Sequence, residues 1–339
     1  MVAHLSVAVS GQSQIGEARR AAARMAEEAQ LGETERGAVG VVVTELASNL
    51  SKYATNGRIL LQVLRRSSGA CVEVLAIDSG PGMLDVERCL RDGFSTSGTP
   101  GTGLGAVRRM ATEFDIHSTP GAGTVVLARV GAQCGRPAEH GYQWAAVSAP
   151  APNEMVCGDA WRVAERDGEI ALLVADGLGH GPLAAEAADL AADVFDAGAF
   201  DSPGELVERA HRALGGSRGA ALAAAHLARN GVVRYAGVGN IAGSLVTSSQ
   251  SRGMASQNGT VGVQMRKAQQ LAYDWPERAL LIMHSDGVSN RWSLDAHEGL
   301  IGRHPAVVAA VLLRDFGRGR DDATVVVVRS DRRTAGAAP

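Results

Sequence analysis

Residues 172–181 read LLVADGLGHG, an apolar strand-like run that ends in an aspartate followed by a glycine. Two carboxylates about 4 Å apart repel by roughly 4 kcal/mol at an effective dielectric of 20, so a cluster of aspartates is unfavourable without cations. A pair of divalent cations removes this repulsion and can make a bound water nucleophilic. Three further motifs in the second half of the chain set an aspartate beside an apolar run: Cys157-Gly158-Asp159, Ser285-Asp286-Gly287 and Asp321-Asp322-Ala323-Thr324. Together the four motifs predict a β-scaffold that gathers hard oxygen ligands into one metal-binding pocket.

The length and charge of the chain are those of a globular protein with about two domains. The chain has 339 residues, so each of two domains would be large enough for its own core. The net charge is −3 at pH 7, so no strong basic field favours nucleic acid or an anionic membrane. We therefore expect neither of them as a partner.

The cysteines and the N-terminal sequence favour a reducing cytoplasm. Cys71, Cys89, Cys134 and Cys157 are scattered without a C-x-x-C pair, which argues against a disulfide or zinc framework. Residues 1–16 lack the cationic start and long apolar core of a signal peptide. No uncharged apolar run reaches the ~18 residues of a membrane-spanning helix. We expect a cytoplasmic protein.

The first half of the chain has the pattern of an α/β sandwich, with helices on one face of a mixed sheet. The glycine- and proline-bearing stretch GAQCGRPAEHG that follows it is typical of a linker. We assign a first domain to residues 1–132, a linker to 133–141, a second domain to 142–332 and a tail to 333–339. The periodicity predicts helices over 12–30, 35–53 and 102–111, and strands over 4–9, 59–64, 71–77, 114–118 and 123–130.

The second half has many strands and few helices, which indicates an α+β layered sandwich. The polar segment 248–259 is predicted to be a mobile loop. Helices are expected over 182–197, 203–214 and 304–315, and strands over 142–149, 159–165, 169–175, 220–228, 231–238, 241–246, 279–285 and 323–329.

Three features of the first half indicate a nucleotide site. Glu45 and Asn49 lie four residues apart on a predicted helix and so share one face. Asp78-Ser79-Gly80-Pro81-Gly82 follows a strand, and Gly101-Thr102-Gly103-Leu104-Gly105 opens a helix, where glycines and the helix N-terminus favour phosphate. Asn49 can ligate Mg²⁺, and the carboxylate of the 78–82 motif can accept a hydrogen bond from an exocyclic amine such as that of adenine. A Rossmann fold is disfavoured, because the glycine run does not follow the first strand.

The order of these motifs resembles the GHKL ATPase family, and within it the bacterial anti-sigma-type serine kinases of the RsbT-like switch group. The matching segments are residues 44–49 (TELASN), 78–82 (DSGPG), 92–98 (DGFSTSG), 101–105 (GTGLG) and 123–124 (GT).

This resemblance implies a GHKL (Bergerat) α/β sandwich with an ATP·Mg²⁺ site. Asn49 would ligate Mg²⁺, Glu45 would be the general base for a substrate hydroxyl, and Asp78 would bind adenine. Lys52 would contact phosphate or lie on the surface, and Thr124 would support the adenine end. The lid over ATP would be short, and a dimer is compatible with the family. The nucleotide would be framed by Gly80, Gly82, Gly101, Gly103 and Gly105.

The acidic motifs of the second half, in their order, resemble the PP2C-like (PPM) phosphatases of the SpoIIE type, and Gly237-Val238-Gly239-Asn240 points to RsbX-like members. The resemblance implies a PP2C-like αββα sandwich with two Mn²⁺ or Mg²⁺ ions that activate a water for attack on a phosphoserine or phosphothreonine. Asp176 would bridge both metals, and the Gly177 carbonyl would be a further ligand. Asp322 would have a hydrogen-bonding role, because many relatives have Asn there. One metal would be held by Asp159 and Asp286, joined by Asp321.

Two histidines lie near these motifs in the sequence. His180 would protonate the leaving group or be a surface histidine, and His284 is expected to be structural. We find no arginine that matches the phosphate-binding arginine of eukaryotic relatives.

These resemblances imply a bifunctional switch protein of a bacterial partner-switching pathway, for example in a stress response. The pathway would act through a sigma factor or through a downstream signalling enzyme. The protein would phosphorylate a serine or threonine of a STAS-domain regulator and dephosphorylate the same or a related STAS protein. Two alternatives stay open: a nucleotide-sensing domain without catalysis that regulates the phosphatase, and an anti-sigma factor fused to a phosphatase. A sensor histidine kinase is disfavoured, since no helical hairpin with a phospho-acceptor histidine is present.

Overall fold

The computed structural model describes residues 3–66, 69–91, 103–131, 141–152, 154–276 and 278–330. The chain divides into two compact units. The N-terminal unit comprises Val2–Arg136 together with Leu294–Arg314, a segment that the sequence places in the second domain. The C-terminal unit comprises Pro137–Ser293 and Asp315–Pro339. In the described part of the chain, no helix is long and apolar enough to cross a membrane.

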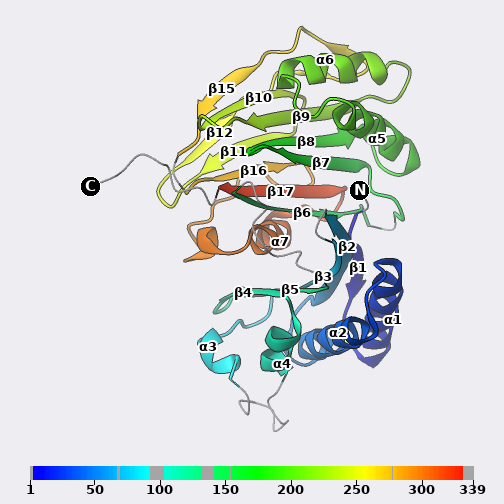
Figure 1. The fold of residues 1–339 in the computed structure, drawn as a ribbon, viewed down its shortest axis with the longest axis vertical. Helices are drawn as coiled ribbons and strands as arrows, with labels where there is room; N and C mark the ends of the chain where they lie inside the picture. Colours follow the sequence, from blue (N-terminus) through cyan, green and yellow to red (C-terminus); the bar gives the residue numbers. More distant parts are fainter. Residues whose placement is uncertain are drawn as a thin grey trace. The chain divides into compact units, whose positions relative to one another are not determined.

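The N-terminal unit is an α/β sandwich built on one five-stranded sheet (Figure 1). The sheet has the strand order β1-β2-β3-β5-β4, and each neighbouring pair is antiparallel. The prediction of a mixed sheet is therefore wrong. Strands β3 and β4 point the same way, but they are not paired with each other, because β5 lies between them. The elements are β1 (Leu5–Ala8), α1 (Gln12–Glu28), α2 (Glu33–Tyr53), β2 (Arg58–Arg66), β3 (Gly69–Asp78), α3 (Val86–Cys89), α4 (Gly103–Met110), β4 (Glu113–Thr119) and β5 (Gly123–Gly131).

One face of this sheet and the two long helices enclose the core of the N-terminal unit. Helix α1 buries Ile15, Ala18 and Ala22 at helical spacing, as its amphipathic pattern predicts. Helix α2 begins where the Glu35 carboxylate accepts a hydrogen bond from the Gly32 amide at 2.9 Å, which satisfies one free N–H of the first turn. Apolar residues of the core-facing side of β3 pack against both helices.

The other face of the sheet carries a buried ion network. Arg129 Nη2 lies 2.6 Å from Glu73 Oε2, and Arg129 Nη1 lies 2.6 Å from Glu113 Oε2. Burial alone would raise the pKa of Glu73, but Arg129 and His4 hold that pKa far below its usual range. Within the same unit, the His304 amide donates to Asp115 Oδ2 at 2.6 Å. The segment Leu294–Arg314 is thereby tied to the edge strand β4.

The C-terminal unit contains two five-stranded sheets, with strand orders β15-β10-β9-β8-β7 and β12-β11-β16-β17-β6 (Figure 1). Apolar residues from both sheets form one core between them, and a second core joins α5 and α6 to the first sheet. The elements are β6 (Tyr142–Ala149), β7 (Asp159–Arg166), β8 (Glu169–Gly177), α5 (Pro182–Asp196), α6 (Pro203–Ala213), β9 (Ala220–Leu227), β10 (Val232–Val238), β11 (Ala242–Val246), β12 (Ser251–Met254), β13 (Gly259–Thr260), β14 (Gln264–Met265), β15 (Leu271–Asp274), β16 (Leu280–His284) and β17 (Ala323–Ser330). The segment Leu294–Arg314 of the other unit contains the 3₁₀ turn Leu300–Gly302 and most of α7 (Pro305–Phe316).

Segment 248–259 differs from its prediction as a mobile loop. Ser251–Met254 forms β12 and pairs with β11, from Gly243 opposite Met254 to Val246 opposite Ser251. The short strand is exposed except at Met254, so it lacks the alternating burial that reveals a strand in sequence. The same weakness hides β13, β14 and β15.

Candidate active sites

Glu45, Asn49 and Gly103 come together where α2 meets the start of α4. The side chains of Glu45 and Asn49 are half-buried and lie one turn apart on the same face of α2. A Cβ atom on Gly103 would lie 2.9 Å from Glu45 Oε2 and 3.9 Å from Asn49 Oδ1. A side chain at this glycine would therefore crowd the carboxylate of the predicted base and lie in van der Waals contact with the predicted Mg²⁺ ligand. The closeness of the first turn of α4 suits a phosphate held at a helix N-terminus.

Asp78 ends β3 at the other end of this candidate nucleotide site. Its Oδ1 accepts a hydrogen bond from the Gly80 amide at 2.7 Å, and burial raises the pKa of this carboxyl, while the Gly80 bond opposes the rise. Thr124 is its partner on β5 and is buried, with its hydroxyl 2.8 Å from the Ser118 hydroxyl. Gly82 has φ +68°, and a Cβ there would collide with the Thr119 carbonyl oxygen at 2.2 Å. This turn requires glycine.

The remaining predicted nucleotide residues are placed as follows. Lys52 is exposed in the last turn of α2, and Gly105 is buried in the first turn of α4. Gly101 and the expected lid residues 92–98 lie outside the described residues. One residue that sequence reasoning missed also reaches this site: Arg314, at the end of the segment Leu294–Arg314, donates from Nη1 to the Asp78 carbonyl oxygen at 3.2 Å.

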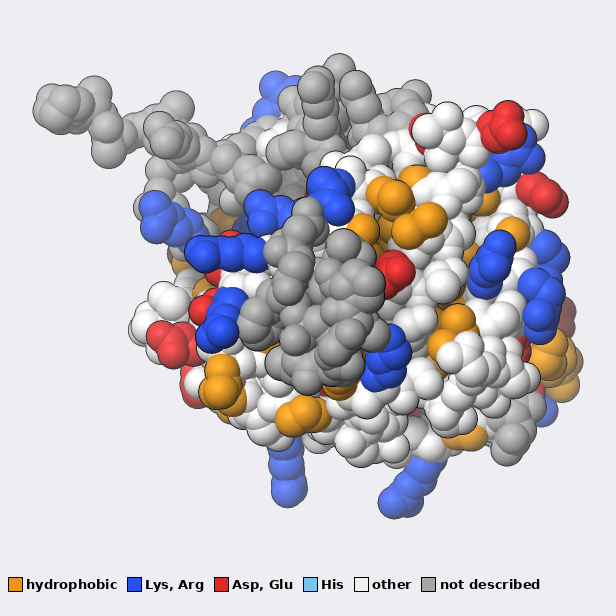
Figure 2. All heavy atoms as spheres, turned by 90° about the horizontal axis from the view of Figure 1, so that it is seen from below, with side chains coloured by type: hydrophobic (Ala, Val, Ile, Leu, Met, Phe, Trp, Pro, Cys, Tyr) orange, Lys and Arg blue, Asp and Glu red, His pale blue; other side chains and the backbone are white. Residues whose placement is uncertain are grey.

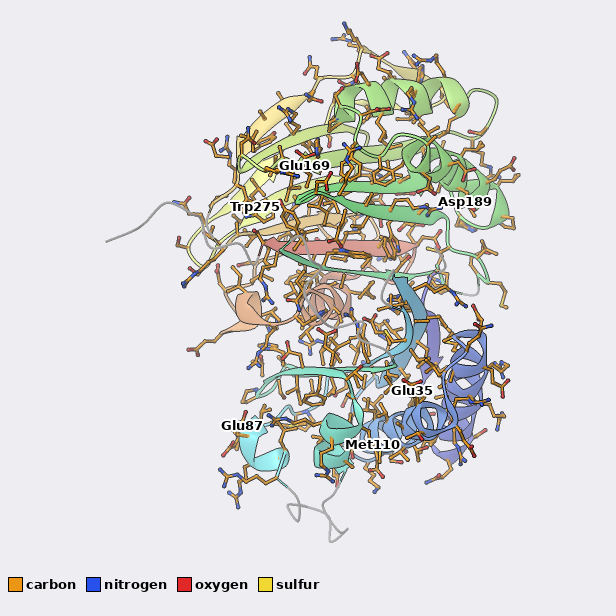
Figure 3. The ribbon with its side chains drawn as sticks, in the orientation of Figure 1. Glu35, Glu87, Met110, Glu169, Asp189 and Trp275 are labelled. Atoms are coloured by element: carbon orange, nitrogen blue, oxygen red, sulfur yellow. The ribbon has the colours of Figure 1, made fainter. Side chains whose placement is uncertain are left out.

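In the C-terminal unit, the strand register brings two predicted metal ligands face to face. Asp159 begins β7 and lies directly opposite Asp176 on β8. Strand β8 starts at Glu169 and runs toward α5, on which Asp189 lies (Figure 3), so both aspartates are at the α5 end of the sheet. The Gly177 amide donates to the Gly158 carbonyl at 3.0 Å and closes this end of the pair.

Three further aspartates belong to the same acidic cluster. Asp286 is half-buried, and its Oδ2 accepts a hydrogen bond from Asn240 Nδ2 at 2.6 Å. Asp322 is buried, with Oδ1 accepting from the Ala151 amide at 2.8 Å, whereas Asp321 is exposed. Of these two neighbours, Asp322 therefore faces inward and makes the predicted hydrogen bond.

The electrostatics of the cluster show that its carboxylates repel one another. Burial and then the charge of Asp159, followed by those of Asp286, Asp321 and Asp322, raise the pKa of Asp176 far above that of an ordinary aspartate. The pKa of Asp159 is also raised, chiefly by burial, although hydrogen bonds from Ser285 and Thr324 oppose the rise. The cluster is thus a place where positive charge would be stabilised.

The donor set fits hard divalent cations. Among the predicted ligands, Asp159 Oδ1 is buried without a hydrogen-bond partner, which leaves its lone pairs available to a cation. Within the described ranges, no three acidic, histidine or cysteine side chains are already arranged as a metal cage.

Two polar residues support the cluster and were not predicted as site residues. Ser285 donates from Oγ to Asp159 Oδ2 at 2.7 Å and accepts from the Thr324 amide at 2.9 Å. Asn240 holds Asp286 as described above. The sequence could have indicated both residues, because each belongs to a motif quoted above: Ser285-Asp286-Gly287 and Gly237-Val238-Gly239-Asn240. His180 is largely exposed, and its Nδ1 lies 2.6 Å from Glu154 Oε1.

Replacing Ser285 with alanine is expected to weaken Mn²⁺ binding by about 10–100-fold, as is usual for loss of a residue that orients a metal ligand. The Ser285 hydroxyl donates to the Asp159 carboxylate at 2.7 Å, and an alanine side chain cannot make that bond. Isothermal titration with Mn²⁺ measures the change. Ser289→Ala, at a half-buried serine four residues along the chain, is the control. Equal Mn²⁺ affinity in both variants would contradict the role given to Ser285.

The chain matches known families over both units. Residues 9–130 match the family described as a histidine kinase-like ATPase domain, and residues 166–331 match the family of stage II sporulation protein E, SpoIIE. Over 111 residues the chain is 34% identical to the serine/threonine-protein kinase RsbT of Bacillus subtilis (strain 168), a match that covers 33% of this chain and 84% of RsbT.

Two solved structures resemble the chain over somewhat more than half its length. One comes from work on the bacterial stressosome as a modular system adapted to control secondary messenger signalling. It has a TM-score of 0.51 at 27% identity and covers 56% of this chain and 99% of its own. A structure of RsbX in complex with magnesium has a TM-score of 0.49 at 22% identity, over 57% of this chain and 98% of its own.

The fold and the two family matches define a kinase-like ATPase domain fused to a PP2C-type phosphatase domain. Through its N-terminal unit the chain belongs to the RsbT-like serine/threonine kinase family. Its C-terminal unit is a protein serine/threonine phosphatase domain of the SpoIIE type. Both predicted family memberships are confirmed.

Proposed function

We propose that the chain adds phosphate to, and removes phosphate from, a serine or threonine of STAS-domain proteins in a partner-switching pathway. The observation that carries the proposal is the presence of two different sites in one chain. Glu45 and Asn49 meet Gly103 in one unit, and Asp159 faces Asp176 in the other. The RsbT relationship supports a protein substrate. We also propose a cytoplasmic location, and leave a homodimer open to measurement.

In the kinase reaction, the N-terminal unit would hold ATP·Mg²⁺ between Asn49 and Asp78. The Asp78 carboxylate would accept a hydrogen bond from the adenine amine, and the first turn of α4 would face the phosphates. Glu45 would take the proton from the substrate hydroxyl, which is the step that its position beside Asn49 and Gly103 supports. The chain's own contribution is then the orientation of the nucleotide and the movement of one proton.

In the phosphatase reaction, the acidic cluster would hold two Mn²⁺ or Mg²⁺ ions through Asp159, Asp176, Asp286 and Asp321, with the Gly177 carbonyl. Bound divalent ions lower the pKa of water and neutralise charge on a phosphate monoester. Ser285 and Asn240 orient two of the carboxylates by the hydrogen bonds given above. The orientation of these ligands is what the chain's own residues supply.

Two opposed activities in one chain would consume ATP without net effect unless something alternates them, and we propose that nucleotide binding does so. Arg314 contacts the Asp78 carbonyl, and the segment that it ends lies in the sequence between Asp286 and Asp321. The chain that enters this segment carries Asp286, and the chain that leaves it carries Asp321. A shift of the segment caused by nucleotide at Asp78 would therefore act on both acidic motifs. We expect ATP to change the rate of Mn²⁺-dependent p-nitrophenyl phosphate hydrolysis in the unmodified chain but not in Arg314→Ala. Hydrolysis that ATP leaves unchanged in the unmodified chain would contradict this coupling.

Intact-protein mass spectrometry of a STAS protein incubated with the chain tests the proposed function. We expect a mass increase of one phosphate with ATP and Mg²⁺, and its loss when the phosphorylated protein is incubated with Mn²⁺ alone. No mass increase, together with ATP-dependent control of the phosphatase, would instead favour a nucleotide sensor. Capture of a sigma factor, in place of STAS proteins, would favour the anti-sigma alternative.

A further inference from the structure

We propose that five exposed apolar side chains around the acidic cluster form a docking collar for the phosphorylated protein substrate. The collar consists of Met155, Val156, Leu178, Leu183 and Val263. The inference rests on the proposed phosphatase function and adds to it the surface that holds the protein partner. It commits to one occupant, a folded STAS protein whose phosphorylated side chain is surrounded by an apolar surface.

The large apolar side chains with the greatest exposure in the described part of the C-terminal unit are those of the collar. Met155 is 96% exposed, Val263 61%, Leu178 58% and Leu183 54%. In the described part of the C-terminal unit, Leu271 is the one other large apolar side chain with comparable exposure, at 38%. Single exposed apolar residues are ordinary on protein surfaces, whereas a contiguous group marks an interaction site.

One backbone hydrogen bond and two close approaches at glycines show that the segments carrying the collar are neighbours. The Leu178 amide donates to the Gly219 carbonyl at 2.9 Å, and a Cβ on Gly219 would lie 2.7 Å from Val263 Cγ2. On the other side, a Cβ on Gly181 would lie 3.2 Å from Glu154 Oε2, in the segment that carries Met155 and Val156. The segments that carry the five exposed side chains therefore lie next to one another beside the acidic cluster.

The collar adjoins the acidic cluster along the chain on two sides. Val156 precedes Asp159 by three residues, and Leu178 follows Asp176 by two. A phosphate monoester that reached the cluster would bring the surface around it against these segments. A small ester would leave the collar exposed to water, but a protein would cover it and gain the free energy of apolar burial.

The charges beside the collar also suit a phosphorylated protein. Arg218 is exposed, and its Nη1 lies 2.9 Å from the position of a Cβ on Gly179, in the loop that follows Asp176. A guanidinium at this place favours an anionic group on the partner. The side chain of Met155 is unbranched, and such a side chain can adapt its shape to a partner surface. The collar thus combines adaptable apolar contacts with one cation.

The test compares two substrates on full-length chains. One chain carries Met155→Ser, Leu183→Ser and Val263→Ser, one change in each neighbouring segment, and a control chain carries Leu271→Ser. The substrates are p-nitrophenyl phosphate and a phosphorylated STAS protein, both with Mn²⁺. We expect the triple variant to raise KM for the protein at least about tenfold, since a few buried apolar contacts commonly dominate an interface. We expect kcat, and both constants for p-nitrophenyl phosphate, to stay within about twofold.

The outcomes separate the docking proposal from the function on which it rests. An unchanged KM for the protein in the triple variant would overturn the collar while leaving the phosphatase intact. Equal losses on both substrates would assign these residues to the shape of the metal site and so also overturn docking. A dimer of the unmodified chain that becomes a monomer in the triple variant, by light scattering, would make the collar an interface between copies. If the unmodified chain hydrolyses p-nitrophenyl phosphate but no phosphorylated STAS protein, the partner itself is wrong.

Discussion

Replacing Asp176 with asparagine is expected to lower Mn²⁺-dependent hydrolysis of a phosphate monoester by at least about 100-fold, because loss of a residue that only orients a ligand already costs 10–100-fold. Asp176 lies opposite Asp159, and its raised pKa reflects burial first and then the charges of the other aspartates. An amide in its place has no charge with which to balance two cations. Hydrolysis of p-nitrophenyl phosphate across a range of Mn²⁺ concentrations measures the loss.

The matched control is Asp189→Asn, an exposed aspartate on α5 (Figure 3). It should keep the activity of the unmodified chain. Asp176→Asn should still bind a fluorescent ATP analogue, because the nucleotide residues belong to the other unit. Undiminished hydrolysis in Asp176→Asn would show that the acidic cluster is not the catalytic metal site.

Replacing Glu45 with glutamine is expected to slow phosphate transfer from ATP to a STAS protein by roughly 10²–10⁴-fold, the usual contribution of a general base. The glutamine has nearly the same size, so its position beside Asn49 and Gly103 should be kept, but it cannot accept the hydroxyl proton. Transfer of radiolabel from γ-labelled ATP measures the rate, and nucleotide affinity should change little.

Glu33→Gln, at an exposed glutamate in the first turn of the same helix, is the control for this loss. Asn49→Ala should behave differently from both variants, with weakened binding of Mg²⁺·ATP. If Glu45→Gln transferred phosphate as fast as Glu33→Gln, Glu45 would not be the base. The N-terminal unit would then fit the nucleotide-sensor alternative better.

Sequence patterns predicted most of the fold because the core elements have strong periodicity. The helix that carries Glu45 and Asn49 was predicted to within two residues of its observed start, and the shared face follows from its geometry. The strands that carry the acidic motifs were predicted for the same reason. Short exposed strands such as β12 could not be, since their pairing depends on a neighbouring strand and not on their own residues.

The sequence predicted the candidate metal ligands, but it did not predict the residues that hold those ligands by hydrogen bonds. The bond from Ser285 to Asp159 joins residues 126 positions apart, and no local pattern reveals it. Asp321 and Asp322 are adjacent acids, and only the packed structure shows that Asp322 is the buried one. The contact of Arg314 with Asp78 was also unpredictable, because segment Leu294–Arg314 belongs by sequence to the other half of the chain.

The absence of a nucleic-acid partner was predicted from net charge. On the face of the molecule shown in Figure 2, Lys and Arg side chains are spread over the surface and are not gathered into one patch. A protein that follows a phosphate backbone commonly presents its basic residues as a stripe or patch. The expectation that nucleic acid is not a partner stays a prediction.

The most direct test is a crystal structure of the full chain with Mn²⁺ and a non-hydrolysable ATP analogue, with data collected at the manganese absorption edge. We expect two anomalous peaks between Asp159, Asp176 and Asp286, and nucleotide density that runs from Asp78 to Asn49. Two empty sites under these conditions, with the aspartates turned away from one another, would contradict the account.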